Sequence, residues 1–323
     1  MKERHFNLML ILLLLVLIPL SLVLGSANTS LQEVFSSLIG RGHDQSITYI
    51  VTKLRLPRIL CALLCGASLS ISGVVFQAVL QNSMADPFIL GVSSGGSLGA
   101  AIAVSLGVSS LTGFSLLGSM FSALLILCFA SHHPSQTRLI LSGVAINYLF
   151  SSLMTLLMFL NHQHYERIFF WTLGSFGAST YLQFLGTACA FAVAFIPLLF
   201  CTKELDMLLM DTSSALSMGL NVRKYQSLFL GLGTIAVAPC VANFGVIGFI
   251  GLLSPHLCRL VLGPKHKRLL PSSALMGSLL LLGSDTLARL ILPSGEMPVG
   301  VVTSLLGTPL LIFMLKKSRY NYG

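Results

Sequence analysis

The stretch Pro87–Thr137 reads PFILGVSSGGSLGAAIAVSLGVSSLTGFSLLGSMFSALLILCFASHHPSQT and contains no Asp, Glu, Lys or Arg. It is long enough for two helices of about 20 residues, the length that crosses the hydrocarbon core of a bilayer. Further uncharged stretches separate the charged residues downstream, at 139–165, 168–202, 225–258 and 269–284. This spacing predicts an all-α polytopic membrane protein.

The composition supports the same prediction. Hydrophobic residues make up 54% of the 323-residue chain and charged residues 9%, whereas soluble domains carry about 25% charged residues. The net charge of +9 does not indicate a nucleic-acid partner, because the basic residues stand singly or in small groups beside apolar stretches, as membrane anchors do. The seven cysteines lie in or beside apolar stretches without a C-x-x-C pair, so we expect helix packing rather than disulfides or a metal site.

Ten apolar segments are predicted to span the membrane within one domain of residues 1–323. They are 8–25, 59–80, 89–106, 114–131, 139–160, 183–202, 226–243, 246–263, 272–292 and 299–315. We expect the first to be retained rather than cleaved, because its apolar run is longer than that of a usual signal peptide. An even number of spans puts both termini on one side, and the cytoplasmic side then holds 13 of the 19 basic residues.

Two hydrophilic interruptions stand out. Residues 203–224 are predicted to be cytoplasmic, with Asp211 and the three hydroxyl residues after it capping a short helix that stops at Gly219. Residues 161–179 mix polar and aromatic side chains around Trp171, the one tryptophan of the chain. This second segment is too polar to span, so we expect an interfacial or re-entrant helix on the outer side.

Enzymatic chemistry is not expected of this chain. Gly91–Gly95 matches the G-x-S-x-G pattern of serine hydrolases, but it lies within a glycine repeat, Gly91, Gly95 and Gly99, that is typical of close helix packing. The sequence has no G-x-x-x-x-G-K-[ST] motif for ATP hydrolysis.

Two other polar features have competing interpretations. His162 and His164 could bind a metal or haem, but without a carboxylate or thiolate partner a solvated loop is the better interpretation, and we predict no metal site. Asp285 and Arg289 are spaced i, i+4 on one predicted helix and are expected to form a structural pair. The alternative for Asp285 is a proton relay in a proton-coupled secondary transporter.

A series of motifs from about Leu54 to Lys316 resembles the FecCD-type permeases, the membrane subunits of ABC importers for iron-siderophores, haem and cobalamin. The clearest are LRLPR at 54–58, QNSMADP at 81–87, LGVSSG at 90–95, LSGVAIN at 141–147, ALSMGLNV at 215–222, GFIGL at 248–252 and EMPVG at 296–300. The chain departs from the family pattern at Ser83, where a proline is usual, and at Ser284, where alanine is common.

The resemblance implies a type II ABC importer in the bacterial cytoplasmic (inner) membrane, with both termini cytoplasmic. The chain would form a homodimer, bind no cofactor itself, and work with two cytoplasmic ATPase subunits that carry ATP and Mg and with an extracytoplasmic substrate-binding protein. The cargo would be a metal chelate, with an iron-siderophore first and haem or cobalamin as alternatives.

The resemblance also implies roles for individual residues. Three arginines would be exposed to acidic residues of the binding protein: Arg55, Arg58 and Arg289. The segment that couples to the ATPase would include Asp211, Ala215, Gly219, Asn221 and Val222. The translocation path would run along the fifth and tenth helices, with polar contacts from Ser142, Asn147, Ser151, Thr303 and Ser304.

Overall fold

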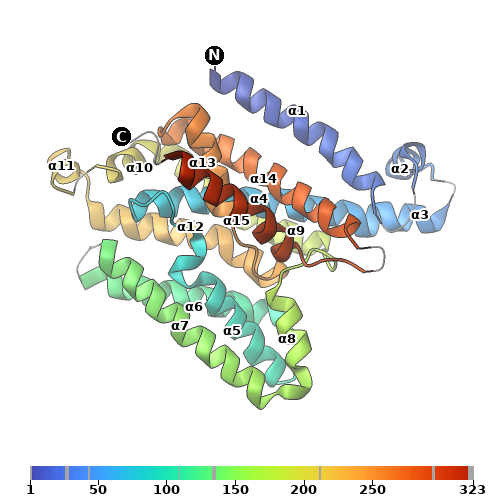
Figure 1. The fold of residues 1–323 in the computed structure, drawn as a ribbon, viewed down its shortest axis with the longest axis horizontal. Helices are drawn as coiled ribbons and strands as arrows, with labels where there is room; N and C mark the ends of the chain where they lie inside the picture. Colours follow the sequence, from blue (N-terminus) through green and yellow to red (C-terminus); the bar gives the residue numbers. More distant parts are fainter. Residues whose placement is uncertain are drawn as a thin grey trace.

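The computed structural model describes residues 2–25, 29–42, 44–108, 110–132, 136–210, 212–292 and 295–318, and in these residues all regular structure is helical. Figure 1 shows the arrangement. The helices are α1 (Lys2–Val23), α2 (Leu31–Leu38), α3 (Gln45–Tyr49), η1 (Ile50–Arg55), α4 (Leu56–Val79), η2 (Pro87–Leu90), α5 (Val92–Ser105), α6 (Leu111–His132), α7 (Gln136–Leu160), η3 (His162–His164), α8 (Tyr165–Thr172), α9 (Tyr181–Phe200), α10 (Thr202–Leu208), α11 (Thr212–Ser217), α12 (Val222–Phe244), α13 (Ile250–Leu262), α14 (His266–Leu290) and α15 (Val299–Ser318).

Each of the ten predicted spans overlaps a separate helix, so the all-α prediction is confirmed. Six helical stretches of the described chain are long and apolar enough to cross a membrane, among them α1, α9, α12 and the continuous run from α3 through α4. The apolar helices α5 and α13 are shorter, as is the apolar stretch Val299–Phe313 of α15. α14 is long but carries Asp285 and Arg289 near its end. The number of membrane spans is therefore approximately ten.

α4 lies at the centre of the molecule and packs against α9, α12, α13 and α14. Nearly all of its residues are buried, and many are Ala, Gly, Ser or Cys, which let neighbouring backbones approach closely. A side chain at Gly66 would collide with the backbone carbonyl of Gly277 on α14, and one at Gly73 would collide with the carbonyl of Gly251 on α13. The centre of the fold thus depends on small residues.

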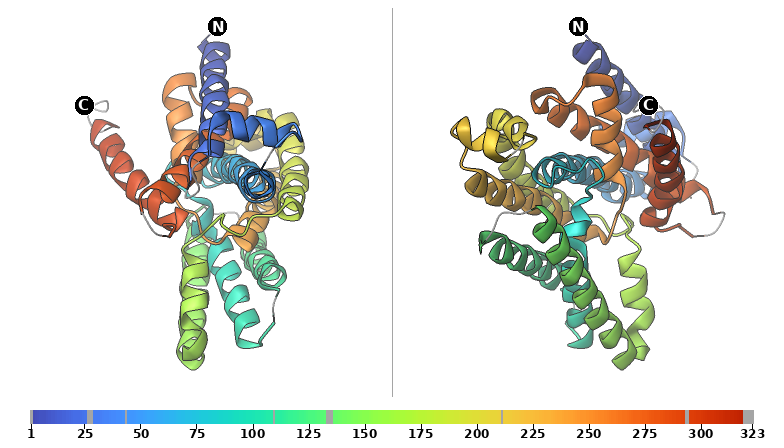
Figure 2. Two further views of the ribbon diagram at one scale, coloured as in Figure 1. Left: turned by 90° about the vertical axis from the view of Figure 1, so that its right-hand side faces the viewer. Right: turned by 60° about the vertical axis from the view of Figure 1, so that its left-hand side comes forward.

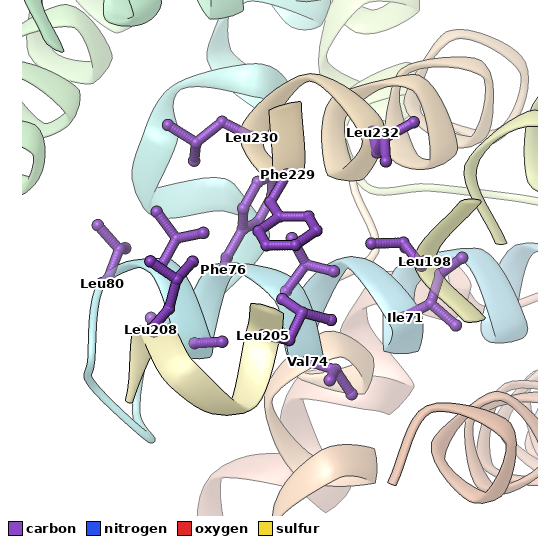
Figure 3. Close-up of a cluster of buried hydrophobic side chains, with 14 of the residues drawn as sticks. Ile71, Val74, Phe76, Leu80, Leu198, Leu205, Leu208, Phe229, Leu230 and Leu232 are labelled. Carbon is purple, nitrogen blue, oxygen red and sulfur yellow. The ribbon is translucent and has the colours of Figure 1, made fainter. Parts of the chain in front are cut away.

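Larger apolar side chains fill the space at one end of α4. Figure 3 shows Phe76 of α4 against Phe229 of α12, with Leu205 and Leu208 of α10 pointing into the same cluster. All four side chains are buried. The short helix α10 is therefore fixed to the core by its apolar face, although it belongs to the hydrophilic 203–224 segment.

The glycine repeat of α5 is confirmed as a packing surface. Side chains at Gly95 and Gly99 would meet the backbone carbonyls of Gly118 and Phe114 on α6, so the two helices touch through their backbones. Gly91 precedes α5 with a left-handed φ of 73° that suits glycine. Figures 1 and 2 show α5, α6 and α7 as a group beside the layer that contains α4, α12 and α14.

The molecule has two polar ends. α2, α3 and the segment between α14 and α15 lie at one end, and α10 and α11 lie at the opposite end (Figure 1). α1 begins and α15 ends toward the α10–α11 end. This arrangement is the one expected for an even number of crossings.

We predict that Gly277→Ala destabilises the protein by about 1–3 kcal/mol, because its new methyl group would be forced into Ser70 and the backbone of Gly66. The matched control is Gly231→Ala on α12, where an added methyl group meets nothing within 4 Å. Denaturant-induced unfolding of both variants in detergent micelles measures the difference. Equal stability of the two variants would contradict the close α4–α14 contact.

Candidate functional site

Five charged side chains meet where α4 begins and α14 ends, and we call them the arginine cluster: Arg55, Arg58, Asp285, Arg289 and Glu296. Arg55 ends η1, and Arg58 lies in the first turn of α4 directly after Pro57. Asp285 and Arg289 lie in the last two turns of α14, and Glu296 lies between α14 and α15. Residues far apart in the sequence meet here because α4 and α14 pack along each other in opposite directions.

Asp285 is the centre of the cluster and is fully buried. The Nε of Arg58 donates to both carboxylate oxygens of Asp285, at 3.1 and 3.0 Å, and Nη2 donates to Oδ1 at 2.8 Å. The Nε of Arg289 lies 3.5 Å from Asp285 Oδ2, so the predicted i, i+4 pair is confirmed. A buried carboxylate is tolerated when guanidinium groups surround it in this way.

Glu296 is bound differently. Nη1 of Arg58 donates to its two carboxylate oxygens at 2.8 and 2.7 Å. The Glu296 side chain is 43% exposed, whereas that of Asp285 is 0% exposed. Arg58 therefore binds two carboxylates, of which Glu296 is accessible to water and Asp285 is not.

Arg55 and Arg289 hold the end of α1. Nη1 of Arg55 donates to the carbonyl of Leu22 at 2.6 Å and to that of Val23 at 3.0 Å. Arg289 donates to the carbonyls of Ser21 and Leu24 at 3.2 and 3.1 Å. The last carbonyls of a helix lack partners within it and carry the negative end of its dipole, so both cations stabilise this terminus. The sequence analysis missed this role.

The expectation that Arg55, Arg58 and Arg289 are exposed is wrong. Each is less than a tenth exposed, because its guanidinium is taken up by partners within the chain. The three arginines instead line a cavity of about 230 Å³ together with Gly25, Ile50, Leu54, Gly177 and Glu296. A partner would reach the guanidinium groups through this cavity rather than across a flat surface.

The 203–224 segment folds as expected where it is described. α11 is the short helix, and Gly219 follows it with a left-handed φ of 83°. Asp211 lies outside the described residues. Asn221 caps α12, with its Oδ1 accepting from the backbone N of Lys224 at 3.1 Å.

The predicted coupling residues divide by exposure. Gly219 and Asn221 are exposed, whereas Ala215 and Val222 are buried in the core. Four large apolar side chains on the same segment, which the sequence analysis did not single out, are exposed: Leu209, Met210, Leu216 and Met218. We call these four exposed side chains the apolar surface of the 203–224 segment. α11, which carries Leu216, projects beyond the other helices (Figure 1).

The five predicted path residues lie on two helices, Ser142, Asn147 and Ser151 on α7 and Thr303 and Ser304 on α15. Asn147 connects α7 to its neighbours, because its Oδ1 accepts from Ser94 at 2.7 Å and its Nδ2 donates to the carbonyl of Phe88 at 3.0 Å. Thr303 is buried, and Ser142 is bonded to the carbonyl of Leu139 within its own helix. Ser151 is exposed on α7. Ser304 of α15 lines a cavity of about 660 Å³.

The hydrolase and metal alternatives find no support in the geometry. Ser93 and Ser94 lie in the first turn of α5, after a 3₁₀ turn rather than a strand, and Ser94 donates to Asn147. His162 and His164 lie in η3 and are exposed. Within the described part of the chain, no three His, Cys, Asp or Glu side chains are close enough to hold a metal ion.

The long apolar helices, packed around the buried α4, define a polytopic membrane protein. A solved metal-chelate type ABC transporter in an inward-facing conformation has the same fold, with a TM-score of 0.88 and 31% identity over 97% of this chain and 99% of that one. The model of the FecCD transport family matches residues 13–317. The chain belongs to the FecCD transport family.

Two similar proteins are themselves permeases, which agrees with this family. A probable iron chelatin transport system permease protein of Helicobacter pylori J99 is 35% identical over 99% of both chains. The vitamin B12 import system permease protein BtuC of Salmonella typhimurium is 39% identical over 83% of this chain and 84% of its own length. The resemblance seen in the sequence motifs is confirmed, and the chain is a permease of an ABC importer rather than an enzyme.

We predict that Asp285→Asn lowers the free energy of unfolding by about 3–5 kcal/mol, because it leaves Arg58 and Arg289 buried without their shared counter-charge. Glu296→Gln is the matched control. It removes a half-exposed carboxylate and should cost no more than about 1 kcal/mol. Unfolding in detergent micelles, followed by Trp171 fluorescence, measures both variants. A loss for Asp285→Asn as small as that of the control would contradict the structural pairing.

Proposed function

We propose that this chain forms the membrane path of an ATP-driven importer that carries a metal chelate into the cytoplasm, with an iron-siderophore as the first candidate and haem or cobalamin as alternatives. Membership of the FecCD family supports the importer class. The relatives named for iron chelatin and for vitamin B12 support a large chelate as cargo. The observation that carries the proposal is that α4 and α14 hold a polar group at each end. The arginine cluster lies at one end of the two helices, and the 203–224 segment is bonded to the other.

The assembly proposed is a homodimer of this chain, two ATPase subunits on the cytoplasmic side and a substrate-binding protein on the outer side. The cytoplasmic side would hold both termini and the 203–224 segment. ATP and Mg would bind to the ATPase subunits, because this sequence has no phosphate-binding motif of its own.

The outer docking site would be the arginine cluster. Acidic residues of a binding protein would enter the cavity and form charge-assisted hydrogen bonds with the guanidinium groups. Glu296 already occupies Nη1 of Arg58, and it is the accessible carboxylate of the cluster. A docking carboxylate would therefore replace Glu296, while Asp285 stays buried and holds α4 to α14.

The cytoplasmic docking site would be the apolar surface of the 203–224 segment. The exposed Leu216 and Met218, on and directly after α11, are suited to a pocket on a partner protein, since interface centres are depleted of charged residues and methionine is enriched there. Gly219 and Asn221 would fix the turn that presents them.

Asp285 as a proton relay is not favoured. Both of its oxygens accept hydrogen bonds from Arg58, and Arg289 lies beside it. Both oxygens are thus occupied by fixed arginine donors, which is the geometry of a structural ion pair rather than of a group that passes a proton to a neighbour.

Uptake in proteoliposomes tests the function. Vesicles with the permease, its ATPase and its binding protein are given a ferric siderophore, haem or cobalamin, each with and without ATP. We expect one of the three chelates to accumulate in the vesicles, and only when ATP is present. Uptake driven by a pH gradient without ATP would contradict the proposal and support the secondary transporter.

We predict that Glu296→Gln tightens docking of the binding protein, because it removes the carboxylate that competes with the partner for Arg58. The gain should be about tenfold or less, because an exposed ion pair contributes little binding energy. Arg58→Gln should weaken docking, and the loss should shrink at high salt. Surface plasmon resonance on permease in nanodiscs measures both affinities. Weaker docking by Glu296→Gln would show that the carboxylate helps the partner instead of competing with it.

We predict that Leu216→Ser combined with Met218→Ser weakens ATPase association by at least tenfold, because two apolar contacts of an interface centre are lost. Leu31→Ser is the control, since Leu31 is equally exposed but lies on α2 at the opposite end. Co-purification and titration with the ATPase subunit provide the measurement. Equal affinity of the double variant and the control would refute this docking surface.

A further inference from the structure

We propose that Asp206, His266 and Gln81 form a latch that fixes the 203–224 segment to the ends of α14 and α4, so that a displacement of this segment by an ATPase moves both helices. In this role the three are positioning residues for transport. The inference rests on the proposed coupling role of the 203–224 segment.

The first part of the latch joins α10 to α14. His266 is the first residue of α14 and is fully buried. Its Nδ1 lies 2.6 Å from Oδ1 of Asp206, and the same oxygen accepts from the backbone N of His266 at 2.9 Å. The N-cap residue of α14, Lys265, makes no side-chain cap of its own. Asp206 therefore caps α14 from another helix.

The chemistry of His266 shows that this contact is specific. Its Nε2 is buried and has no hydrogen-bond partner among the described residues, so the ring makes one polar contact, with Asp206. A proton on Nδ1 lets the ring donate to the Asp206 carboxylate, which can only accept when it is ionised. Burial alone would raise the pKa of Asp206, but the two hydrogen bonds from His266 and the electrostatic attraction to His266 and Lys265 together outweigh burial and lower that pKa. An apolar residue would fill the same space without an orphaned nitrogen, so a histidine here is explained by its bond to Asp206.

The second part joins α10 to α4. Gln81 follows α4 and has a φ of 46°, a left-handed value that is uncommon for residues other than glycine. Its Nε2 donates to the carbonyl of Leu208 at 2.5 Å and to that of Met210 at 2.9 Å. Carbonyls at the end of a helix lack partners within it, and Gln81 supplies a donor for them here. The strained backbone of Gln81 is thus matched by two bonds to the segment.

α4 and α14 are themselves joined along their length. Ser278 donates to the carbonyl of Leu63 at 2.7 Å, and Gly66 and Gly277 leave no space between the two backbones. At the far end, Arg58 binds Asp285. A packed core of this kind transmits displacement rather than absorbing it. The latch therefore connects the 203–224 segment with the arginine cluster through one continuous pair of helices.

Amide hydrogen exchange of the permease alone in nanodiscs tests the latch without any partner. Asp206→Ala and His266→Ala should each accelerate exchange in α10 and α11 by at least tenfold. Asp206→Asn keeps an acceptor oxygen and should remain near the native rate. Lys267→Ala, an exposed neighbour of His266, is the control and should change nothing. Native exchange rates in both alanine variants would overturn the latch.

The ratio of ferric siderophore transported to ATP hydrolysed tests the transmission. We expect this ratio to fall at least threefold in Asp206→Ala and His266→Ala while the ATPase still binds, and the double variant to be no worse than the more affected single one. An unchanged ratio in variants with accelerated exchange would overturn the transmission. If the ATPase of the native complex does not bind the 203–224 segment, the proposed coupling role fails, and the exchange experiment still decides whether the latch exists.

Discussion

The buried carboxylate of Asp285 is the constraint on which the rest of the structure depends. A charge at this depth must be neutralised, and the arginines that do so come from the first turn of α4 and the last turn of α14. Their geometry fixes the register of the two helices, which then pack with no side chain between Gly66 and Gly277. The central helix pair is held by one ion cluster and a line of small residues.

This pair also organises the two functional ends. Arg55 and Arg289 donate hydrogen bonds to the last carbonyls of α1, so the first helix is attached to the same cluster. At the opposite end, Asp206 and Gln81 attach α10 to α14 and α4. A binding protein at one end and an ATPase at the other would therefore act on the same two helices. Coupling between two sites requires such an element, one whose position both partners can bias.

Much of the fold could be predicted from the sequence, because the gaps between charges mark the long helices and the glycine repeat of α5 marks a close contact. The Asp285–Arg289 pair followed from its i, i+4 spacing. The burial of the arginines could not be predicted, because their partners at the end of α1 and at Glu296 are distant in the sequence. The bonds of Asn147 to Ser94 and Phe88 could not be predicted either, since periodicity does not tell which neighbour a polar helix face meets.

The central claim is that α4 and α14 move as one unit during transport, and spin-label distances in the complete importer test it most directly. The exposed Lys53 lies on η1, which continues directly into α4, so labels at Lys53 and Leu290 report on this pair. Labels at Leu290 and Ser151 report on α14 against α7, with the exposed Cys128 and Cys189 replaced. The account predicts that the first distance stays constant between the nucleotide-free and ATP-bound states while the second changes. A change in the first distance on ATP binding would contradict it.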